Sequence, residues 1–264
     1  MIHHDGRLKP EATRLDGNFL KKPTPRINAV SFDELQAYDV GRLQPGSKYA
    51  ARRPARAHFD GARIPELAAF DALLAEKTDP DFRAYAELKT NLRDAAQADA
   101  LADAYCAALT SSPIAKQHIV ISFDWRCINR VRAAFPNMRH AYTTMGFAET
   151  DPDHESAAQE APDSLSALIR TASKNGAPWW DEMDWRDMDG DSHGERVLRA
   201  IKAGGGSDWF ADWHDVTPQN MALAQDLGLA VSAWTVNRPT DMARLAELGV
   251  AAIITDRPDL LKNL

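Results

Sequence analysis

Two charged residues two positions apart, Glu87 and Lys89, are the first candidates for chemistry in this sequence. They fall in the stretch 82–90, where period-2 alternation places them with Tyr85 on one face of a predicted β-strand. Burying a carboxylate and an ammonium on a core strand is costly unless each has a partner. One interpretation is therefore a structural ion pair. The functional alternative is a metal-binding carboxylate beside a phosphate-binding lysine.

Polar residues also follow two apolar runs near the end of the sequence. Residues 230–236 are typical of a buried strand, which ends in the stretch Trp234-Thr235-Val236-Asn237. A second apolar run, residues 250–254, is followed by Thr255-Asp256-Arg257. In parallel α/β folds, sites form at the C-terminal ends of strands. The same residue types are also common in ordinary turns, and spacing alone favours that interpretation.

Histidines occur at the start of the chain and at the start of two predicted strands. His3, His4 and Asp5 open the sequence, where the ordinary interpretation is a frayed and solvated terminus. His118 and His140 begin their strands, at the end of a barrel away from the chemistry, which favours structural roles.

Two further motifs do not meet the requirements of a ligand site. The acidic stretch 187–191 is not a calcium loop, because Gly190 stands at loop position four and Leu198 occupies the place of the bidentate glutamate. The glycines 204–206 lack both the Walker lysine and the Rossmann spacing. The tryptophans at 179, 180 and 185 either line a substrate pocket or pack an enlarged loop, and packing is favoured.

The elements that must position these residues follow a strand–helix–strand order. After the strand at 230–236, Pro239 suits the first turn of a helix and Gly249 suits its C-terminal end. Strand, helix and strand in so short a stretch form a βαβ unit, which requires parallel strands and an α/β fold. The core strands are predicted to start near residues 82, 117, 139, 207, 229 and 250.

Composition indicates a soluble globular chain. Its 264 residues suit one α/β barrel of about 250 residues. The net charge of -7 argues against a nucleic-acid partner, although a metal could still bring in an anionic substrate. No run is long enough for a membrane span and no signal peptide is evident, so we expect a cytoplasmic protein. Cys106 and Cys127 lack metal-ligand spacing and are expected to be reduced and structural.

The order WTVN (234–237), a helix, then GVAAIITDRPDLL (249–261) resembles the last two βα units of the glycerophosphodiester phosphodiesterase family. Glu87-Leu88-Lys89 is similar to the Glu-x-Lys of that family, and Ser122-Phe123 is similar to a strand that ends in Ser-Phe. The resemblance implies a TIM (β/α)8 barrel of the phosphodiesterase type and a single domain over residues 1–264.

The resemblance also implies a function in lipid and glycerol metabolism. The family consists of metal-dependent phosphodiester hydrolases that cleave glycerophosphodiesters to glycerol 3-phosphate and an alcohol, with Mg²⁺ or Ca²⁺ as the divalent cation. Carried over by motif, His4 is a catalytic histidine, Glu87 a metal ligand, and Lys89 and Trp234 substrate-binding residues. With the resemblance, the functional interpretation of Glu87 and Lys89 is favoured.

The sequence departs from the family pattern at its beginning. A His-Arg-Gly strand and a Glu-x-Asp strand have no counterpart, so we expect a barrel that lacks roughly its first two strands, through a truncated or misplaced start. A leader ahead of such a start is an alternative to the cytoplasmic location. The sequence also predicts no measurable hydrolysis of glycerophosphocholine by residues 1–264 alone. The competing hypothesis is a catalytically inactive fragment or binding remnant of the same fold.

Overall fold

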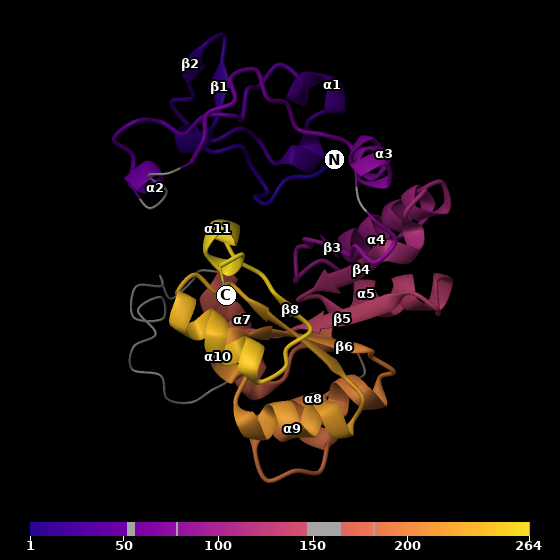
Figure 1. The fold of residues 1–264 in the computed structure, drawn as a ribbon. Coiled ribbons are helices and arrows are strands. Elements are labelled where there is room, and N and C mark those ends of the chain that lie inside the picture. Colours follow the sequence, from indigo (N-terminus) through magenta and orange to yellow (C-terminus); the bar gives the residue numbers. More distant parts are fainter. Residues whose placement is uncertain (52–55, 78, 147–164, 182, 264) are drawn as a thin grey trace. The chain divides into compact units, whose positions relative to one another are not determined.

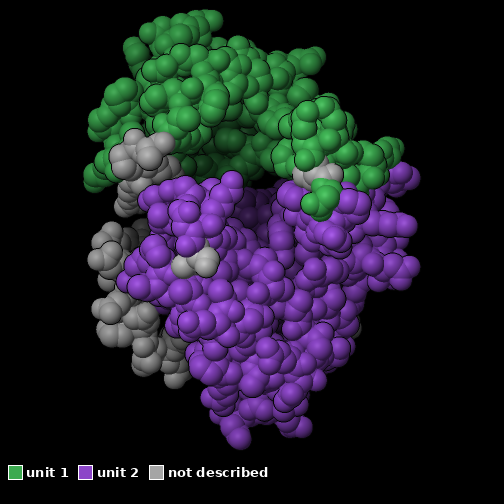
Figure 2. Space-filling model, in the orientation of Figure 1, with its two compact units in different colours: residues 1–79, 111–114 green, residues 80–110, 115–264 purple. Residues whose placement is uncertain are grey.

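The computed structural model describes residues 1–51, 56–77, 79–146, 165–181 and 183–263. The chain divides into two compact units (Figure 2). Unit 1 comprises residues 1–79 and 111–114, and unit 2 comprises residues 80–110 and 115–264. Each unit is described by itself.

Unit 1 consists of short elements around a small apolar core. Its strands β1 (Arg14–Leu15) and β2 (Asn18–Phe19) pair antiparallel. Its helices are α1 (Phe32–Leu35), α2 (Lys48–Ala51) and α3 (Leu67–Lys77), with 3-10 turns at Pro10–Ala12 and Ile27–Ala29. Leu8, Leu35 and Ile64 form the buried core.

The first helix begins at a capping box, which the spacing of Ser31 and Glu34 in the sequence predicts. The Ser31 hydroxyl accepts a hydrogen bond from the Glu34 amide, and the Glu34 carboxylate accepts one from the Ser31 amide at 2.9 Å. This reciprocal capping box satisfies two amides that a helix start would otherwise leave unpaired.

In helix α3, the spacing of apolar residues alone predicts a buried face made of Leu67, Phe70, Leu73 and Leu74. That prediction is wrong for Phe70 and Leu73, which are exposed, whereas Asp71 is buried. At 3.6 residues per turn, Asp71 shares one side of the helix with Leu67 and Leu74, and this is the side that turns inward. The regular spacing of apolar residues therefore identified the helix but not its buried face.

Unit 2 is built on a curled parallel sheet, and the six predicted strands are confirmed. In the part of the chain that the structure describes, the sheet order follows the chain order and every neighbouring pair is parallel (Figure 1). The strands are β3 (Ala84–Glu87), β4 (His118–Ser122), β5 (Arg139–Thr143), β6 (Asp208–Asp212), β7 (Ala230–Trp234) and β8 (Ala252–Ile253). This is the strand arrangement of a TIM-type barrel, seen here as a partial barrel.

Helices connect the strands and cover the sheet (Figure 1). They are α4 (Ala95–Thr110), α5 (Trp125–Ala134), α7 (Leu165–Asn175), α8 (His193–Ala203), α9 (Pro218–Asp226), α10 (Pro239–Glu247) and α11 (Pro258–Leu261), with 3-10 turns at Ala115–Gln117, Pro178–Trp180, Trp185–Asp187 and Trp213–Asp215. None of the helices in the described ranges is long and apolar enough to cross a membrane.

Local signals fix most helix ends in unit 2. Thr217 caps α9 by accepting from the Asn220 amide at 3.1 Å, and Gly249 adopts φ 82° just beyond α10, as predicted. The sequence also predicts Asn91 as the cap of α4, and this prediction is wrong. The helix begins at Ala95, and Asp94 accepts from the Gln97 amide at 3.0 Å. Asn91 instead caps a turn before the helix.

The tryptophan-rich segment packs against α5, as favoured from the sequence. Trp180 stacks on Trp125 with ring centroids 4.6 Å apart and planes 7° from parallel. Both rings are buried, and so is Trp179. These indoles are therefore part of the structural core of unit 2.

The inner face of the sheet is defined by register and by contacts across it. Directly paired residues of parallel strands point to the same side of the sheet. Tyr85 is paired with Ile119, and Phe210 is paired with Ser232, and these four side chains lie on one face. Tyr85 and Ser232 lie on β3 and β7, which are not neighbours, yet their hydroxyl oxygens are 2.9 Å apart. The sheet must therefore curve so that this face lies inside.

Candidate active site

Polar and aromatic side chains gather at the carboxyl-terminal edge of the inner face. Glu87 is the last residue of β3, Asp212 the last of β6 and Trp234 the last of β7. Asp212 and Trp234 are directly paired in register, and Trp234 packs against the inner cluster that includes Phe210. Because the strands are parallel, their C-terminal ends share one edge, which is where barrel enzymes place their chemistry.

Glu87 and Lys89 form an ion pair at this edge. The Lys89 Nζ atom lies 2.7 Å from Glu87 Oε2, and both side chains are partly exposed. The predicted same-face spacing thus brings the two groups into contact. An exposed pair of this kind contributes little to stability, so each partner can exchange the other for a charged ligand at low cost.

Trp234 forms part of an aromatic wall at the same edge of the sheet. Its indole Nε1 donates to the Phe210 carbonyl oxygen at 3.2 Å, which fixes the ring. Phe123, immediately after β4, meets it edge to face with centroids 5.6 Å apart. Phe210 stacks on its other side with centroids 6.3 Å apart. Phe210 is buried, whereas Phe123 and Trp234 are half-buried and can contact the carbon atoms of a ligand.

His4 belongs to unit 1, whereas the three other predicted site residues belong to unit 2. Its side chain is 79 % exposed, and its Nδ1 atom lies 3.3 Å from Asp5 Oδ1. The hydrogen bond with His4, together with Lys9 at 2.9 Å, holds the pKa of the Asp5 carboxyl well below its usual range. His4 is thus accessible and held beside an ionised carboxylate.

Sequence reasoning missed an aspartate–histidine pair at the same edge of unit 2. His214 Nδ1 lies 2.7 Å from Asp212 Oδ1, and both side chains are largely buried. The signal that could have revealed it is simple. Asp212 and His214 are spaced Asp-x-His at the end of the predicted strand at 207–213.

The described residues do not make up a complete divalent-cation site. Across the described ranges, no group of three or more His, Cys, Asp or Glu side chains could hold a metal ion. At the strand edge, Glu87 offers one carboxylate, and it is paired with Lys89. Mg²⁺ and Ca²⁺ take about six or more oxygen ligands, so we derive no step of chemistry through a cation.

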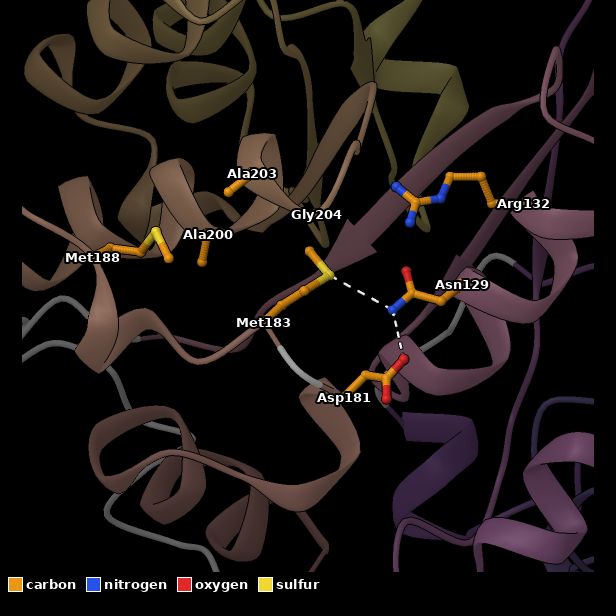
Figure 3. Close-up of a pocket in the computed structure, with 8 residues that line it drawn as sticks. All are labelled: Asn129, Arg132, Asp181, Met183, Met188, Ala200, Ala203 and Gly204. Atoms are coloured by element: carbon orange, nitrogen blue, oxygen red, sulfur yellow. Dashed lines mark hydrogen bonds between the residues drawn. The ribbon is translucent and has the colours of Figure 1, made fainter.

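A separate cavity of about 430 Å³ lies away from this edge, between α5 and α8. Figure 3 shows Asn129 and Arg132 on one side of it and Met183 on another; Asn129 Nδ2 donates to Asp181 Oδ2 at 2.9 Å. None of the predicted site residues lines it. The strand edge, rather than this cavity, is therefore the candidate active site.

A curled parallel sheet with an ion pair, an aromatic wall and a carboxylate–histidine pair at its carboxyl edge defines an enzyme of the TIM-barrel class. More specifically, the chain belongs to the glycerophosphoryl diester phosphodiesterase family, whose family model matches residues 1–260. The protein is therefore an enzyme of the glycerophosphodiester phosphodiesterase class, as the sequence resemblance implied.

Solved structures agree with this assignment. A protein from Silicibacter pomeroyi DSS-3, assigned as a glycerophosphoryl diester phosphodiesterase, is 26% identical, with a TM-score of 0.75 over 99% of this chain and 76% of that chain. A phosphodiesterase from Oleispira antarctica, in complex with the product sn-glycerol-3-phosphate, is 14% identical, with a TM-score of 0.62 over 99% of this chain and 77% of its own. The second likeness shows the fold alone. No curated protein matches the sequence.

Proposed function

We propose that this protein hydrolyses small-molecule glycerophosphodiesters to glycerol 3-phosphate and an alcohol, a reaction of lipid and glycerol metabolism. The observation that carries the proposal is that the Glu87–Lys89 pair and Trp234 share the carboxyl edge of the sheet, in a chain of this family. The O. antarctica phosphodiesterase of the same fold binds sn-glycerol-3-phosphate, which is one of the two products proposed here.

Each residue has a role that follows from its chemistry. The Lys89 ammonium, released from Glu87, pairs with a phosphate oxygen of the substrate. Trp234 contacts the carbon atoms of the glycerol or of the head group. His4, exposed and next to Asp5, transfers a proton during cleavage.

We also propose that turnover depends on a divalent cation, Mg²⁺ or Ca²⁺, with Glu87 as one of its ligands. The support is family membership, together with a carboxylate at the strand edge. A bound cation would neutralise phosphate oxygens. Because the family model runs across both compact units, we further propose that they function as one domain.

The test is direct assay of the full chain with glycerophosphocholine, following release of choline and glycerol 3-phosphate. The sequence alone predicts no hydrolysis by residues 1–264, but the family model spans residues 1–260, so we expect activity that requires Mg²⁺ or Ca²⁺ and disappears with EDTA. Lys89→Met should raise KM at least tenfold, because one charge-assisted hydrogen bond to phosphate contributes about 1.5–3 kcal/mol. The matched control is Lys116→Met, an exposed lysine outside the site, which should leave KM unchanged. Absence of hydrolysis under every cation condition would contradict the proposal and favour an inactive family member.

A further inference from the structure

The cavity between α5 and α8 plays no part in the proposed hydrolysis, and its lining combines two kinds of chemistry. Its volume of about 430 Å³ is that of a small-molecule site. The polar part of the lining consists of Asn129 and Arg132 of α5 together with Asp181 (Figure 3). The apolar part includes Met183, Met188 and Ala203. A molecule that fills this cavity must therefore carry both polar groups and a hydrocarbon body.

Arg132 and Asp181 bring opposite charges to the cavity without pairing with each other. Within the described residues, the Arg132 guanidinium makes no hydrogen bond and no ion pair. Asp181 Oδ2 accepts a hydrogen bond from Asn129 Nδ2 at 2.9 Å. Asn129 and Arg132 are three residues apart on α5, so they share one face of that helix. A ligand with both an anionic group and an ammonium group can therefore satisfy both charges from one position.

The Asp181 carboxylate is held in place from the core of unit 2. The hydroxyl of buried Tyr142 donates to Asn129 Oδ1 at 2.6 Å, which leaves the amide nitrogen to face Asp181. The backbone of Asp181 has φ 59°, in the left-handed region that favours glycine. Strained residues of this kind persist where the surrounding structure fixes them, and they cluster at ligand sites.

Two of the glycines at 204–206 make room for side chains of the cavity. A Cβ atom at Gly204 would lie 2.0 Å from Met183 Cε. A Cβ atom at Gly205, where φ is 78°, would lie 2.3 Å from Arg132 Nη1. The thioether and the guanidinium can therefore occupy their positions only because positions 204 and 205 carry no side chain.

Helix capping accounts for only part of this arrangement. Gly204 is the C-cap of α8, and a cation near the C-terminus of a helix is favourable. Capping thus explains a glycine and a nearby positive charge. It explains neither the Asp181 carboxylate nor an open volume beside two methionines.

We propose that this cavity is a binding site for a small zwitterion, namely an α-amino acid with an aromatic side chain. Its carboxylate pairs with Arg132, and its ammonium group pairs with Asp181. Its ring packs against Met183 and Met188, because thioether sulfur makes favourable contacts with aromatic rings. A simple anion would be repelled by Asp181 and a simple cation by Arg132. The inference does not depend on the proposed function.

Isothermal titration of the full chain with L-phenylalanine tests the proposal, with thermal unfolding as a check on folding. We expect one saturable site with a Kd of about 1 mM or lower. Phenylacetate lacks the ammonium group and 2-phenylethylamine lacks the carboxylate. Each should bind at least about tenfold more weakly, because each loses one charge-assisted contact.

Two substitutions remove the charges of the cavity. Arg132→Gln should raise the Kd for L-phenylalanine at least about tenfold. Asp181→Asn keeps an acceptor for Asn129 and tolerates the positive φ, so it should fold normally and raise the Kd by a similar factor. It should also give L-phenylalanine and phenylacetate similar Kd values. The matched control is Arg130→Gln, which should leave the Kd unchanged, because Arg130 is an exposed residue of α5 that pairs with Asp103.

Ala203→Phe tests where the ligand binds. Ala203 is an exposed part of the lining, so a larger side chain there fills the cavity without disturbing the core and should abolish binding. Three results would overturn the proposal. They are no saturable binding of L-phenylalanine up to about 10 mM by the folded wild-type protein, phenylacetate binding as tightly as L-phenylalanine, and wild-type Kd values in both Arg132→Gln and Ala203→Phe. Should Arg132→Gln not fold, the Kd of Asp181→Asn decides. Because the titration does not measure hydrolysis, its failure would leave the proposed function in place.

Discussion

Lys89 Nζ lies 2.7 Å from Glu87 Oε2, at the point where β3 ends and the inner face of the sheet meets its carboxyl edge. Residues two apart on a strand share a face, so local geometry produces this contact. Both side chains are partly exposed, with 34 % and 26 % of their surfaces accessible, and solvent screens their attraction. The pair is therefore better suited to exchange partners with an incoming ligand than to stabilise the fold.

Replacing the Glu87 carboxylate distinguishes a role as cation ligand from a role in a structural ion pair. Glu87→Gln should lower kcat by two or more orders of magnitude if Glu87 binds the cation, because a neutral amide is a poor ligand for a hard cation. Its free energy of unfolding should change by less than about 1 kcal/mol, the value of an exposed ion pair. Urea unfolding and product release measure the two effects. A large loss of stability with kcat intact would support the structural interpretation of the pair.

The aromatic wall should affect substrate binding more than stability. Trp234→Phe keeps a ring against Phe123 and Phe210 and is expected to retain KM within a few-fold. Trp234→Ala removes the surface that a ligand would contact, so KM should rise about tenfold or more, since contacts with a buried aromatic ring contribute on the order of 1–3 kcal/mol. Equal KM values for the two variants and the wild type would exclude Trp234 from the binding site.

His140 should make unit 2 sensitive to acid. Burial, with Arg132 adding to it, lowers the pKa of His140 from 6.5 to about 4. Between these values the unfolded chain binds a proton that the folded protein does not, so stability falls as the pH decreases from 6.5 to about 4. The loss can reach about 3 kcal/mol. His140→Gln should flatten this part of the stability–pH curve, measured by urea unfolding, whereas His58→Gln should not. An identical slope in His140→Gln would show that other groups cause it.

Gly41 tests the packing of unit 1. A Cβ atom at this position would lie 1.7 Å from the Phe59 carbonyl oxygen and 2.9 Å from the Ala62 Cβ. Backbone must move to admit it, so Gly41→Ala should destabilise unit 1 by about 1–3 kcal/mol or more. Hydrogen exchange of peptides from residues 1–79 would report the change. Gly6→Ala, whose nearest neighbour would be 3.7 Å away, is the control and should exchange like the wild type. Unaltered protection in Gly41→Ala would contradict the tight approach.

Local sequence was sufficient wherever a few neighbouring residues decide the conformation. The Ser31–Glu34 capping box, the Thr217 cap and the order of six strands were all readable, because caps and periodicity act within a few residues. The Glu87–Lys89 contact belongs to the same class, since strand alternation alone places both groups on one face. Where two local signals compete, the sequence was less informative, and Asp94 rather than Asn91 caps α4.

Only the tertiary structure decided which distant residues meet. Trp234 contacts Phe123 and Phe210 because β4, β6 and β7 curve around one interior, a relation that no local pattern specifies. The buried side of α3 likewise depends on what the helix packs against. The Asp-x-His spacing of Asp212 and His214 can be seen in the sequence, but the position of this pair on the inner rim follows from strand register. Register and burial arise from contacts between segments far apart in the chain. The sequence therefore determined the elements and their order, and packing determined the site.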